Sequence, residues 1–376
     1  MAGIYIHIPF CKQACSYCNF HFSTSPGLRN QLIDALCSEV ELTPVFSSDE
    51  KIETIYFGGG TPSILNTDQL FQILNSITKK FSIDPKAEIT LEANPDDIQA
   101  GSLESWHKLG FNRLSVGLQS FDEKELVWMN RAHHADQSIE ALEQINLSAF
   151  ENYSIDLIYG SPLQTDAQLL HNLNIIDSYK VPHISCYGLT IEPGTRLHHL
   201  VEKKKQVATD DNKQSSQFLL IMQWMRAHGY DHYEVSNYAL PGMKSRHNSS
   251  YWSAKSYYGF GPSAHSFDGR RTRKWNIANN ALYIKSLERQ IIPSEEEILT
   301  AEQQLNEYVM TSLRTSSGTD LEKINNEWGD EHRRRIETGL SKFTQQGYLI
   351  RENSSYRLTD KGMLIADGIA SDLFVV

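Results

Sequence analysis

The sequence predicts an α/β protein: a partial (β/α)6 barrel of the TIM type, followed by a smaller, mainly helical domain that resembles a winged helix. Two observations carry this prediction. Short apolar runs alternate with segments of helical periodicity up to about residue 235, which is typical of successive βα units and a parallel sheet. From about residue 302 the pattern is helical again, and it ends in two short strand-like runs.

Six strands are expected in the barrel, at residues 4–8, 54–57, 88–92, 113–118, 153–158 and 183–189. Six such units can form a barrel that is incomplete relative to the eight-unit form. The functional residues of such barrels lie at the C-terminal ends of the strands.

Helices are expected at residues 28–45, 67–81, 103–109, 137–147, 167–179 and 210–229, where apolar residues recur at three- and four-residue spacing. Asn66, Thr67 or Asp68 is expected to cap the second of these helices, and Asp166 the fifth.

The chain is expected to divide into three segments. Residues 1–235 form the barrel, residues 236–300 an irregular crossover rich in Tyr, Asn, Ser and Gly, and residues 301–376 the C-terminal domain. The elements expected in the last segment are helices at 304–313, 321–328 and 333–346, strands at 348–351 and 356–358, and a final helix capped by Thr359. Winged-helix units are often associated with DNA, but the three arginines at 333–335 are more typical of a solvated helix face.

The composition indicates a cytoplasmic protein. Lys and Arg number 35 and Asp and Glu 46, and a net charge of −11 argues against general affinity for nucleic acid. Five cysteines, an odd number, suggest a reducing compartment. No basic, apolar start resembles a signal peptide, and no apolar run approaches the roughly 18 residues of a transmembrane segment.

Three cysteines follow the first strand at the spacing C-x-x-x-C-x-x-C: Cys11, Cys15 and Cys18. Thiolates select zinc or iron–sulfur clusters, and three of them on a four-iron cluster leave one iron open for a ligand. The remaining cysteines, Cys37 and Cys186, fall in apolar segments where a thiol is most often a small buried hydrophobe. A zinc site completed by His7 or His21, or three unrelated thiols, are the alternatives.

A second group of polar or glycine residues lies at the ends of later strands. Consecutive glycines at 58–60, followed by Thr61, would let a ligand lie against bare backbone, although a tight turn without a ligand is the simpler explanation. Glu92, Gln119 and Asp156 interrupt or end apolar strands. Because such polar groups are costly to bury unpaired, we expect them to face a ligand or one another.

Together, these features resemble the radical S-adenosylmethionine (SAM) enzymes over essentially the whole chain. The nearest branch holds the oxygen-independent coproporphyrinogen III oxidases and the heme chaperones of the HemW type. The resemblance implies that Cys11, Cys15 and Cys18 bind a 4Fe-4S cluster whose open iron is chelated by SAM. The positions that it implies around SAM are Tyr5, Tyr17, Gly59, Gly60, Thr61, Glu92, Gln119, Arg131 and Asp156.

Two departures favour the heme-chaperone type over the oxidase type. The oxidase pattern has a fourth cysteine where this chain has Phe20, and oxidases carry an N-terminal extension. Residues 247–252 match the H-N-x-x-Y-W motif of the chaperone type, which implies heme contacts at His247, Tyr251 and Trp252. His265 is a second candidate. Without the resemblance, His247 would be read as capping a loop and the aromatic residues as packing between domains.

The resemblance therefore implies a chaperone that binds heme, the cluster and SAM and passes heme to an acceptor protein. A flavodoxin- or ferredoxin-like protein would donate electrons if SAM is cleaved, and whether the chain is an enzyme stays open. The alternative is a coproporphyrinogen III oxidase that decarboxylates two propionates. A DNA-binding regulator is a third class.

Overall fold

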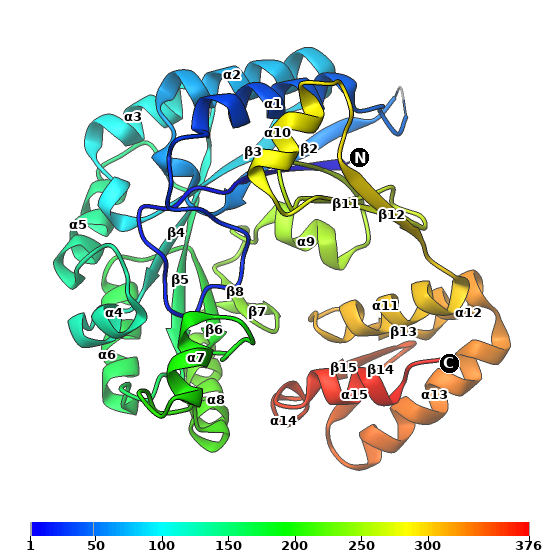
Figure 1. Cartoon of the computed structure of the whole chain (residues 1–376). Coiled ribbons are helices and arrows are strands. Elements are labelled where there is room, and N and C mark those ends of the chain that lie inside the picture. Colours follow the sequence, from blue (N-terminus) through cyan, green and yellow to red (C-terminus); the bar gives the residue numbers. More distant parts are fainter. Residues whose placement is uncertain (1, 48, 376) are drawn as a thin grey trace.

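The computed structural model describes residues 2–47 and 49–375. A twelve-stranded sheet organises the chain up to β12 (Ser294–Ile298), and a separate three-stranded sheet lies in the C-terminal domain (Figure 1). The middle of the twelve-stranded sheet is formed by six consecutive parallel strands: β1 (Ala2–Ile8), β2 (Lys51–Gly59), β3 (Ser82–Ala93), β4 (Arg113–Gln119), β5 (Tyr153–Tyr159) and β6 (His183–Gly188). These are the six strands that the sequence predicts, so the partial barrel is confirmed.

The predicted helices cover the outside of this curved sheet (Figure 1). They are α1 (Arg29–Leu42), α2 (Thr67–Lys80), α3 (Ala100–Lys108), α5 (Ala135–Asn146), α6 (Asp166–Ser178) and α8 (Asp211–Ala227). Two short helices, α4 (Glu123–Met129) and α7 (Arg196–Glu202), were not predicted because seven residues are too few to establish a helical period.

The expected caps are correct for one helix and wrong for another. The side chain of Asn66 accepts a hydrogen bond from the backbone N–H of Gln69, and the two residues form a capping box at the start of α2. At α6 the capping side chain is Thr165, whereas Asp166 lies inside the first turn. A carboxylate there still stabilises the helix through the helix dipole.

The segment at 236–300, predicted to be irregular, is regular. After β7 (Asp231–Glu234) it forms β8 (Asn237–Ala239), α9 (Arg246–Trp252), β9 (Ser256–Phe260), β10 (His265–Phe267), β11 (Thr272–Asn276), α10 (Asn280–Leu287) and β12 (Ser294–Ile298). Strand β9 pairs parallel to β1, and β8 pairs antiparallel to β6, so the segment widens the barrel sheet on both sides. These strands have three to five residues and mixed polarity, which hides their period in the sequence.

One buried carboxylate fastens this added segment to the barrel. Glu39 on α1 accepts hydrogen bonds from the Tyr283 hydroxyl (2.5 Å), the Gly261 backbone N–H (2.8 Å) and the Asn276 amide (2.5 Å). Burial raises the pKa of Glu39 to about 7, despite these hydrogen bonds, which lower it. The extension of the sheet therefore depends on a group that titrates near neutral pH.

The C-terminal domain has the winged-helix order of elements that was predicted. They are α11 (Ala301–Leu313), β13 (Thr319–Asp320), α12 (Leu321–Trp328), α13 (Asp330–Gln345), β14 (Leu349–Glu352) and β15 (Ser355–Leu358), followed by α14 (Asp360–Met363) and α15 (Ala366–Asp372). A separate hydrophobic core holds them together. Thr359 caps α14, as expected. Arg333 and Arg334 are ion-paired to acidic residues of their own helix.

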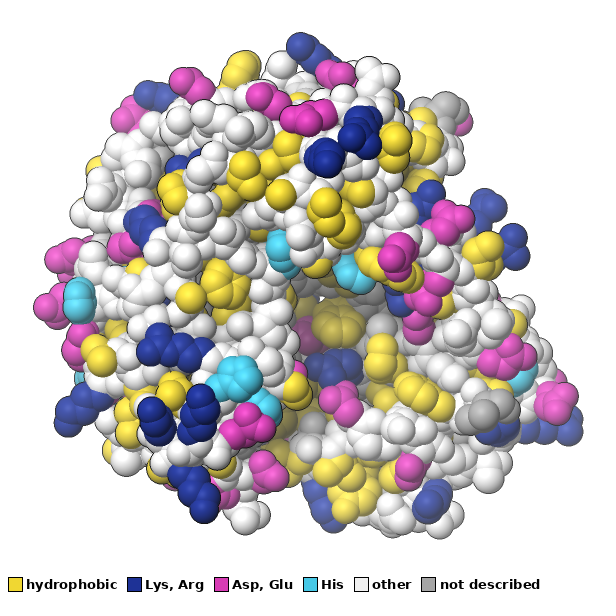
Figure 2. Space-filling view, in the orientation of Figure 1, with side chains coloured by type: hydrophobic (Ala, Val, Ile, Leu, Met, Phe, Trp, Pro, Cys, Tyr) yellow, Lys and Arg dark blue, Asp and Glu magenta, His cyan; other side chains and the backbone are white. Residues whose placement is uncertain are grey.

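The C-terminal domain contacts the barrel sheet at its β7 end. Backbone hydrogen bonds join Val235 to Arg314 (3.0 Å) and Ser316 to Tyr233 (3.0 Å). Between these contacts and the rest of the barrel the surface is hollowed (Figure 2). Within residues 2–47 and 49–375, no helix is long and apolar enough to cross a membrane.

Candidate functional site

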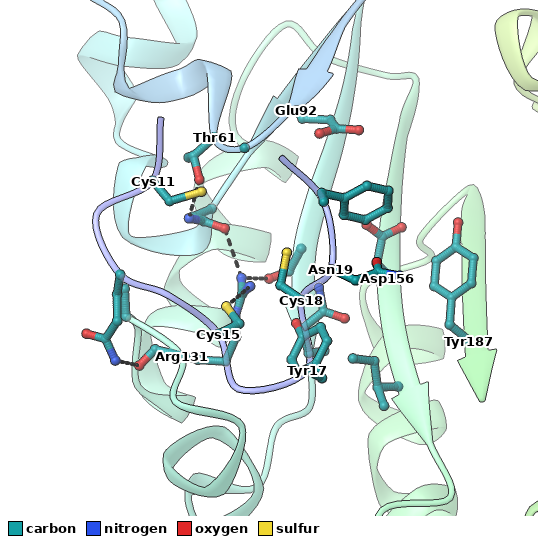
Figure 3. Close-up of a pocket in the computed structure, with 18 of the residues that line it drawn as sticks. Cys11, Cys15, Tyr17, Cys18, Asn19, Thr61, Glu92, Arg131, Asp156 and Tyr187 are labelled. Atoms are coloured by element: carbon teal, nitrogen blue, oxygen red, sulfur yellow. Dashed lines mark hydrogen bonds between the residues drawn. The ribbon is translucent and has the colours of Figure 1, made fainter. Parts of the chain in front are cut away.

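A cavity of about 450 Å³ lies at the C-terminal ends of the barrel strands. The three cysteines line it and turn toward the same space, beside Thr61 and Arg131 (Figure 3). The other predicted site residues that line it are Tyr17, Gly59, Gly60, Glu92, Gln119 and Asp156. The structure thus brings together residues from the cysteine loop, from the ends of β2, β3 and β4, and from the middle of β5.

Hydrogen bonds at the ends of two short helices, including one from the Asn130 side chain, hold the cysteine loop in place. At α4, the backbone N–H of Ser16 donates to the carbonyl of Met129 (2.9 Å), and the Asn130 amide donates to the carbonyl of Ala14 (2.7 Å). At α7, the N–H of Leu197 donates to the carbonyl of Ser16 (2.7 Å). Neither helix was predicted, yet together they fix the loop between Cys15 and Cys18.

Arg131 connects the cysteine loop to the strand ends. Its guanidinium donates to the Cys15 sulfur (3.4 Å), to the Asn94 side-chain oxygen (2.8 Å) and to the Gly117 carbonyl (2.7 Å). Burial lowers the pKa of Arg131, but the nearby Tyr17 and Cys15 outweigh this and hold the pKa above its usual value. The cavity therefore contains one permanent positive charge next to a thiol.

The glycine turn is shaped by close packing against the end of β1. The backbone N–H of Gly60 donates to the carbonyl of Ile8 (2.9 Å), and that of Thr61 donates to the carbonyl of Phe10 (2.7 Å). A Cβ atom at Gly60 would lie 2.7 Å from the Phe10 carbonyl oxygen, and Gly59 has a φ of +107°. Close packing at Gly60 and the positive φ at Gly59 explain why both positions are glycine without a ligand. Both residues also line the cavity.

Two half-buried carboxyl groups face the cavity from β3 and β5. Glu92 accepts hydrogen bonds from the Tyr56 hydroxyl (2.7 Å) and the Gly59 N–H (3.2 Å). Burial raises the pKa of Glu92 to about 7, partly offset by the Tyr56 bond, and burial also raises that of Asp156 to about 6. A ligand amino group or hydroxyl would find acceptors that bear only part of their charge near neutral pH.

Two polar atoms on this wall are buried without a hydrogen-bond partner among the described residues: Oε1 of Gln119 and Nε of Arg131. Unpaired buried polar atoms are costly and uncommon. Gln119 also has a φ of 68°, a conformation that is strained for a residue other than glycine. An acceptor and a donor left free at the same cavity fit a polar ligand that supplies the missing partners.

The set of donors fits a three-cysteine iron–sulfur cluster. Of the described residues, only Cys11, Cys15 and Cys18 bring thiols to this cavity, since Cys37 lies in α1 and Cys186 in β6. The His7 ring is hydrogen-bonded to the His21 carbonyl (2.9 Å), and the His21 ring to Asn280 (2.7 Å). Because neither ring lines the cavity, the structure does not support the zinc alternative with a histidine ligand.

Comparison with known proteins decides the family. A family profile of the radical SAM superfamily matches residues 5–176, and one of the HemN C-terminal domain matches residues 299–365. The protein named heme chaperone HemW in Bacillus subtilis is 33% identical over 98% of this chain and 98% of its own. The chain belongs to the HemW family of radical SAM proteins. A HemW of Mycobacterium tuberculosis is 32% identical over 99% of this chain and 94% of its own.

A solved structure supports the fold assignment. Coproporphyrinogen III oxidase (HemN) from Escherichia coli superimposes with a TM-score of 0.85 over 100% of this chain and 90% of its own, at 21% identity. This likeness shows the fold, barrel and C-terminal domain alike. Membership of the radical SAM superfamily implies a 4Fe-4S cluster and SAM.

One predicted residue lies apart from this cavity, and several residues that line the cavity were missed, among them Asn94, Asn19, Tyr187 and Glu192. Tyr5 is not among the residues that line the cavity; its hydroxyl contacts Nδ1 of His7 (3.1 Å) and its ring stacks on Tyr56. Asn94 was missed, although it accepts from Arg131 and donates to the Thr61 hydroxyl (3.2 Å). Asn94 comes two residues after Glu92, directly after β3, and this position could have indicated that it belongs to the site.

The predicted heme residues lie on α9, away from the cysteines. His247 is 1% exposed, with Nδ1 at 2.8 Å from the Thr54 hydroxyl and Nε2 at 2.9 Å from the Tyr251 hydroxyl. Trp252, at the end of α9, lines a separate cleft toward the C-terminal domain. His265 is exposed on β10. Heme contact at these residues stays a prediction, and ligation by His247 would require the hydrogen bond of the ligating ring nitrogen to break.

Proposed function

We propose that this protein is a cytoplasmic heme chaperone that binds heme and transfers it to an acceptor protein. The observation that carries the proposal is the similarity, over nearly the whole length, to proteins named heme chaperone HemW. Phe20, at the place of the oxidase branch's fourth cysteine, lines the mouth of the cavity and is 67% exposed. An apolar ring there supports the chaperone over the oxidase.

We further propose that Cys11, Cys15 and Cys18 hold the 4Fe-4S cluster and that SAM occupies the rest of the cavity. When bound, the cluster would pass one electron, supplied by a flavodoxin- or ferredoxin-like donor, to SAM, which would split it into methionine and a 5′-deoxyadenosyl radical. The residues of this chain would bind and orient SAM. Arg131 supplies positive charge to a carboxylate, and Gln119 supplies a free acceptor to a polar group.

For heme, the proposal assigns different roles to the residues of α9. Trp252 offers a flat apolar face toward a cleft, which suits a porphyrin. His247 and Tyr251 hydrogen-bond to each other at the inner side of the helix. In the conformation described, they support α9, and they would reach heme only after a local rearrangement.

The test is a paired assay on one anaerobic preparation with a reconstituted cluster. Hemin titration should give a saturating Soret band, and heme should then move to an apo-acceptor such as apo-myoglobin. Incubation with coproporphyrinogen III, SAM and dithionite should give no protoporphyrinogen. Robust turnover of coproporphyrinogen would replace the chaperone with the oxidase, and failure to bind hemin would refute the proposal.

A further inference from the structure

A second cavity, of about 460 Å³, lies between the barrel and the C-terminal domain. The barrel side of this interdomain cleft is formed by β7, α9 and the turn before α9, and the other side by the end of α11, β13 and the start of α12 (Figure 1). Neither wall takes part in the cysteine cavity. Lys244 and Trp252 line the barrel side of the interdomain cleft, and Tyr308 and Lys323 line its C-terminal side.

Each wall of the interdomain cleft presents a lysine placed over an aromatic ring. The Lys244 ammonium lies 5.6 Å from the centre of the Tyr233 ring on the barrel side, and the Lys323 ammonium lies 4.6 Å from the Tyr308 ring on the other. Such contacts hold a cation and a flat apolar surface side by side. Asp320 also lines the cleft, but its carboxylate caps α12 by accepting a hydrogen bond from the backbone N–H of Glu322 (2.9 Å). Lys244 and Lys323 are the cationic side chains that line the cleft.

Each lysine forms only a weak, exposed ion pair, which an incoming carboxylate could replace. Lys244 lies 3.5 Å from Asp231, and Lys323 lies 3.9 Å from Glu327, with lysine side chains that are 44% and 39% exposed. Exposed ion pairs at such distances contribute little to stability, so an incoming carboxylate can replace the present one at small cost.

Trp252 connects this cleft to the motif at 247–252. Its ring is held by the Arg314 guanidinium, which lies 5.7 Å from the ring and is itself ion-paired to Asp367 at 2.5 Å. At the other end of α9, His247 is fixed in the core through Thr54 and Tyr251. The helix therefore turns its histidine inward and its tryptophan toward the cleft.

We propose that the interdomain cleft binds the propionate edge of heme, which rests on the proposed heme-binding function. Lys244 and Lys323 bind the two carboxylates from opposite walls, and Trp252 contacts the porphyrin face. Tyr308, stacked on Trp328, holds the Lys323 ammonium over its ring. A flat dianion with an apolar body matches two cations that flank aromatic rings. Because the two lysines belong to different domains, bound heme bridges barrel and C-terminal domain.

The experiment is a hemin titration of the full chain, followed by its Soret band. In the double variant Lys244→Gln/Lys323→Gln, the apparent Kd for hemin should rise about tenfold or more. Hemin dimethyl ester, whose propionates are uncharged, should bind the wild type and this variant equally. Lys342→Gln is the matched control, because Lys342 also lies over a ring, Phe343, but does not line the cleft. Circular dichroism confirms that each variant is folded.

Trp252→Ala and Trp252→Phe test the aromatic wall separately. The alanine variant should bind both hemin and its dimethyl ester more weakly than the wild type does. The phenylalanine variant should recover much of the lost affinity. If the wild type binds hemin and the double lysine variant binds it equally well, the cleft is not the site and only this inference fails. If the wild type binds no hemin, the proposed function fails and the inference with it.

Discussion

The guanidinium of Arg131 lies 3.4 Å from the sulfur of Cys15. This contact joins the two halves of the candidate site, because Arg131 follows α4 while Cys15 belongs to the loop after β1. The same guanidinium holds Asn94 and the Gly117 carbonyl at the strand ends. One side chain thus positions the cysteine loop, the end of β3 and the end of β4, and it places a positive charge where a cluster with thiolate ligands would sit.

Arg131→Gln should make the reduction potential of the reconstituted cluster more negative. Loss of a positive charge beside a ligand sulfur disfavours adding an electron, by on the order of 100 mV. The reduction potential of Arg131→Lys, which keeps the charge, should lie between those of Arg131→Gln and the wild type. A potentiometric titration monitored by electron paramagnetic resonance (EPR) measures this, and equal potentials in all three proteins would show that Arg131 is remote from the cluster.

Gly60→Ala should destabilise the barrel and lower the yield of reconstituted cluster. The new methyl group would lie 2.7 Å from the Phe10 carbonyl oxygen and 2.8 Å from that of Ile8, so backbone must move. Overpacking of this kind costs about 1–3 kcal/mol. Gly101→Ala on α3 is the control, because nothing lies within 4 Å of its Cβ position and alanine favours helix. Thermal unfolding of the two variants should differ clearly, and similar midpoints would contradict the packing argument.

Glu39→Gln should change how stability depends on pH. The pKa of Glu39 is raised from 4.5 to about 7 in the folded protein, so the folded state binds its proton more tightly than the unfolded state does. Stability from this group is therefore greatest below pH 4.5 and is lost as pH rises toward 7, by up to about 3 kcal/mol. The variant lacks this loss.

Subtracting the free energy of unfolding of the wild type from that of Glu39→Gln at each pH removes the contributions of the other titrating groups. Denaturant unfolding at pH 5, 6, 7 and 8 should show the variant gaining stability relative to the wild type as pH rises. Parallel curves would mean that Glu39 does not change its proton affinity on folding.

His247→Ala should lower stability by about 2–3 kcal/mol, because it leaves Thr54 and Tyr251 without their hydrogen-bond partner and opens a cavity in the core. Burial lowers the pKa of His247 to about 3, so the ring is neutral and no charge effect is expected above pH 5. Tyr251→Phe, which removes one of the bonds, should cost about 1 kcal/mol. Unfolding midpoints that match the wild type would remove His247 from this supporting role.

The strands of the barrel could be read from the sequence because both of their faces are covered. Residues 153–158 contain only two polar residues, Ser154 and Asp156, and β5 is buried along most of its length. By contrast, β12 reads Ser-Glu-Glu-Glu-Ile and is exposed at every position. It is held by pairing with β11, including an ion pair of Glu296 with Lys274 at the sheet edge. Such a strand depends on its neighbour, which a single sequence does not reveal.

The site was predictable where a residue's position along a strand sets its place in space. Glu92 lies near the C-terminal end of β3 and Asp156 in the middle of β5, and both side chains line the cavity at that edge of the sheet. The direction of His247 was not predictable in the same way. Its ring points into the core because α9 packs on β2, a contact between residues nearly 200 positions apart in the chain.

The most direct test of the central claim, that three cysteines leave an iron open to SAM, is an EPR measurement on the reduced, anaerobically purified protein. Wild-type protein should contain about four iron atoms per chain, and its cluster signal should change when SAM is added. Replacing Cys11, Cys15 or Cys18 with alanine should abolish the signal, whereas Cys37→Ala should keep it. Zinc in place of iron, or a cluster signal that SAM leaves unchanged, would contradict the account.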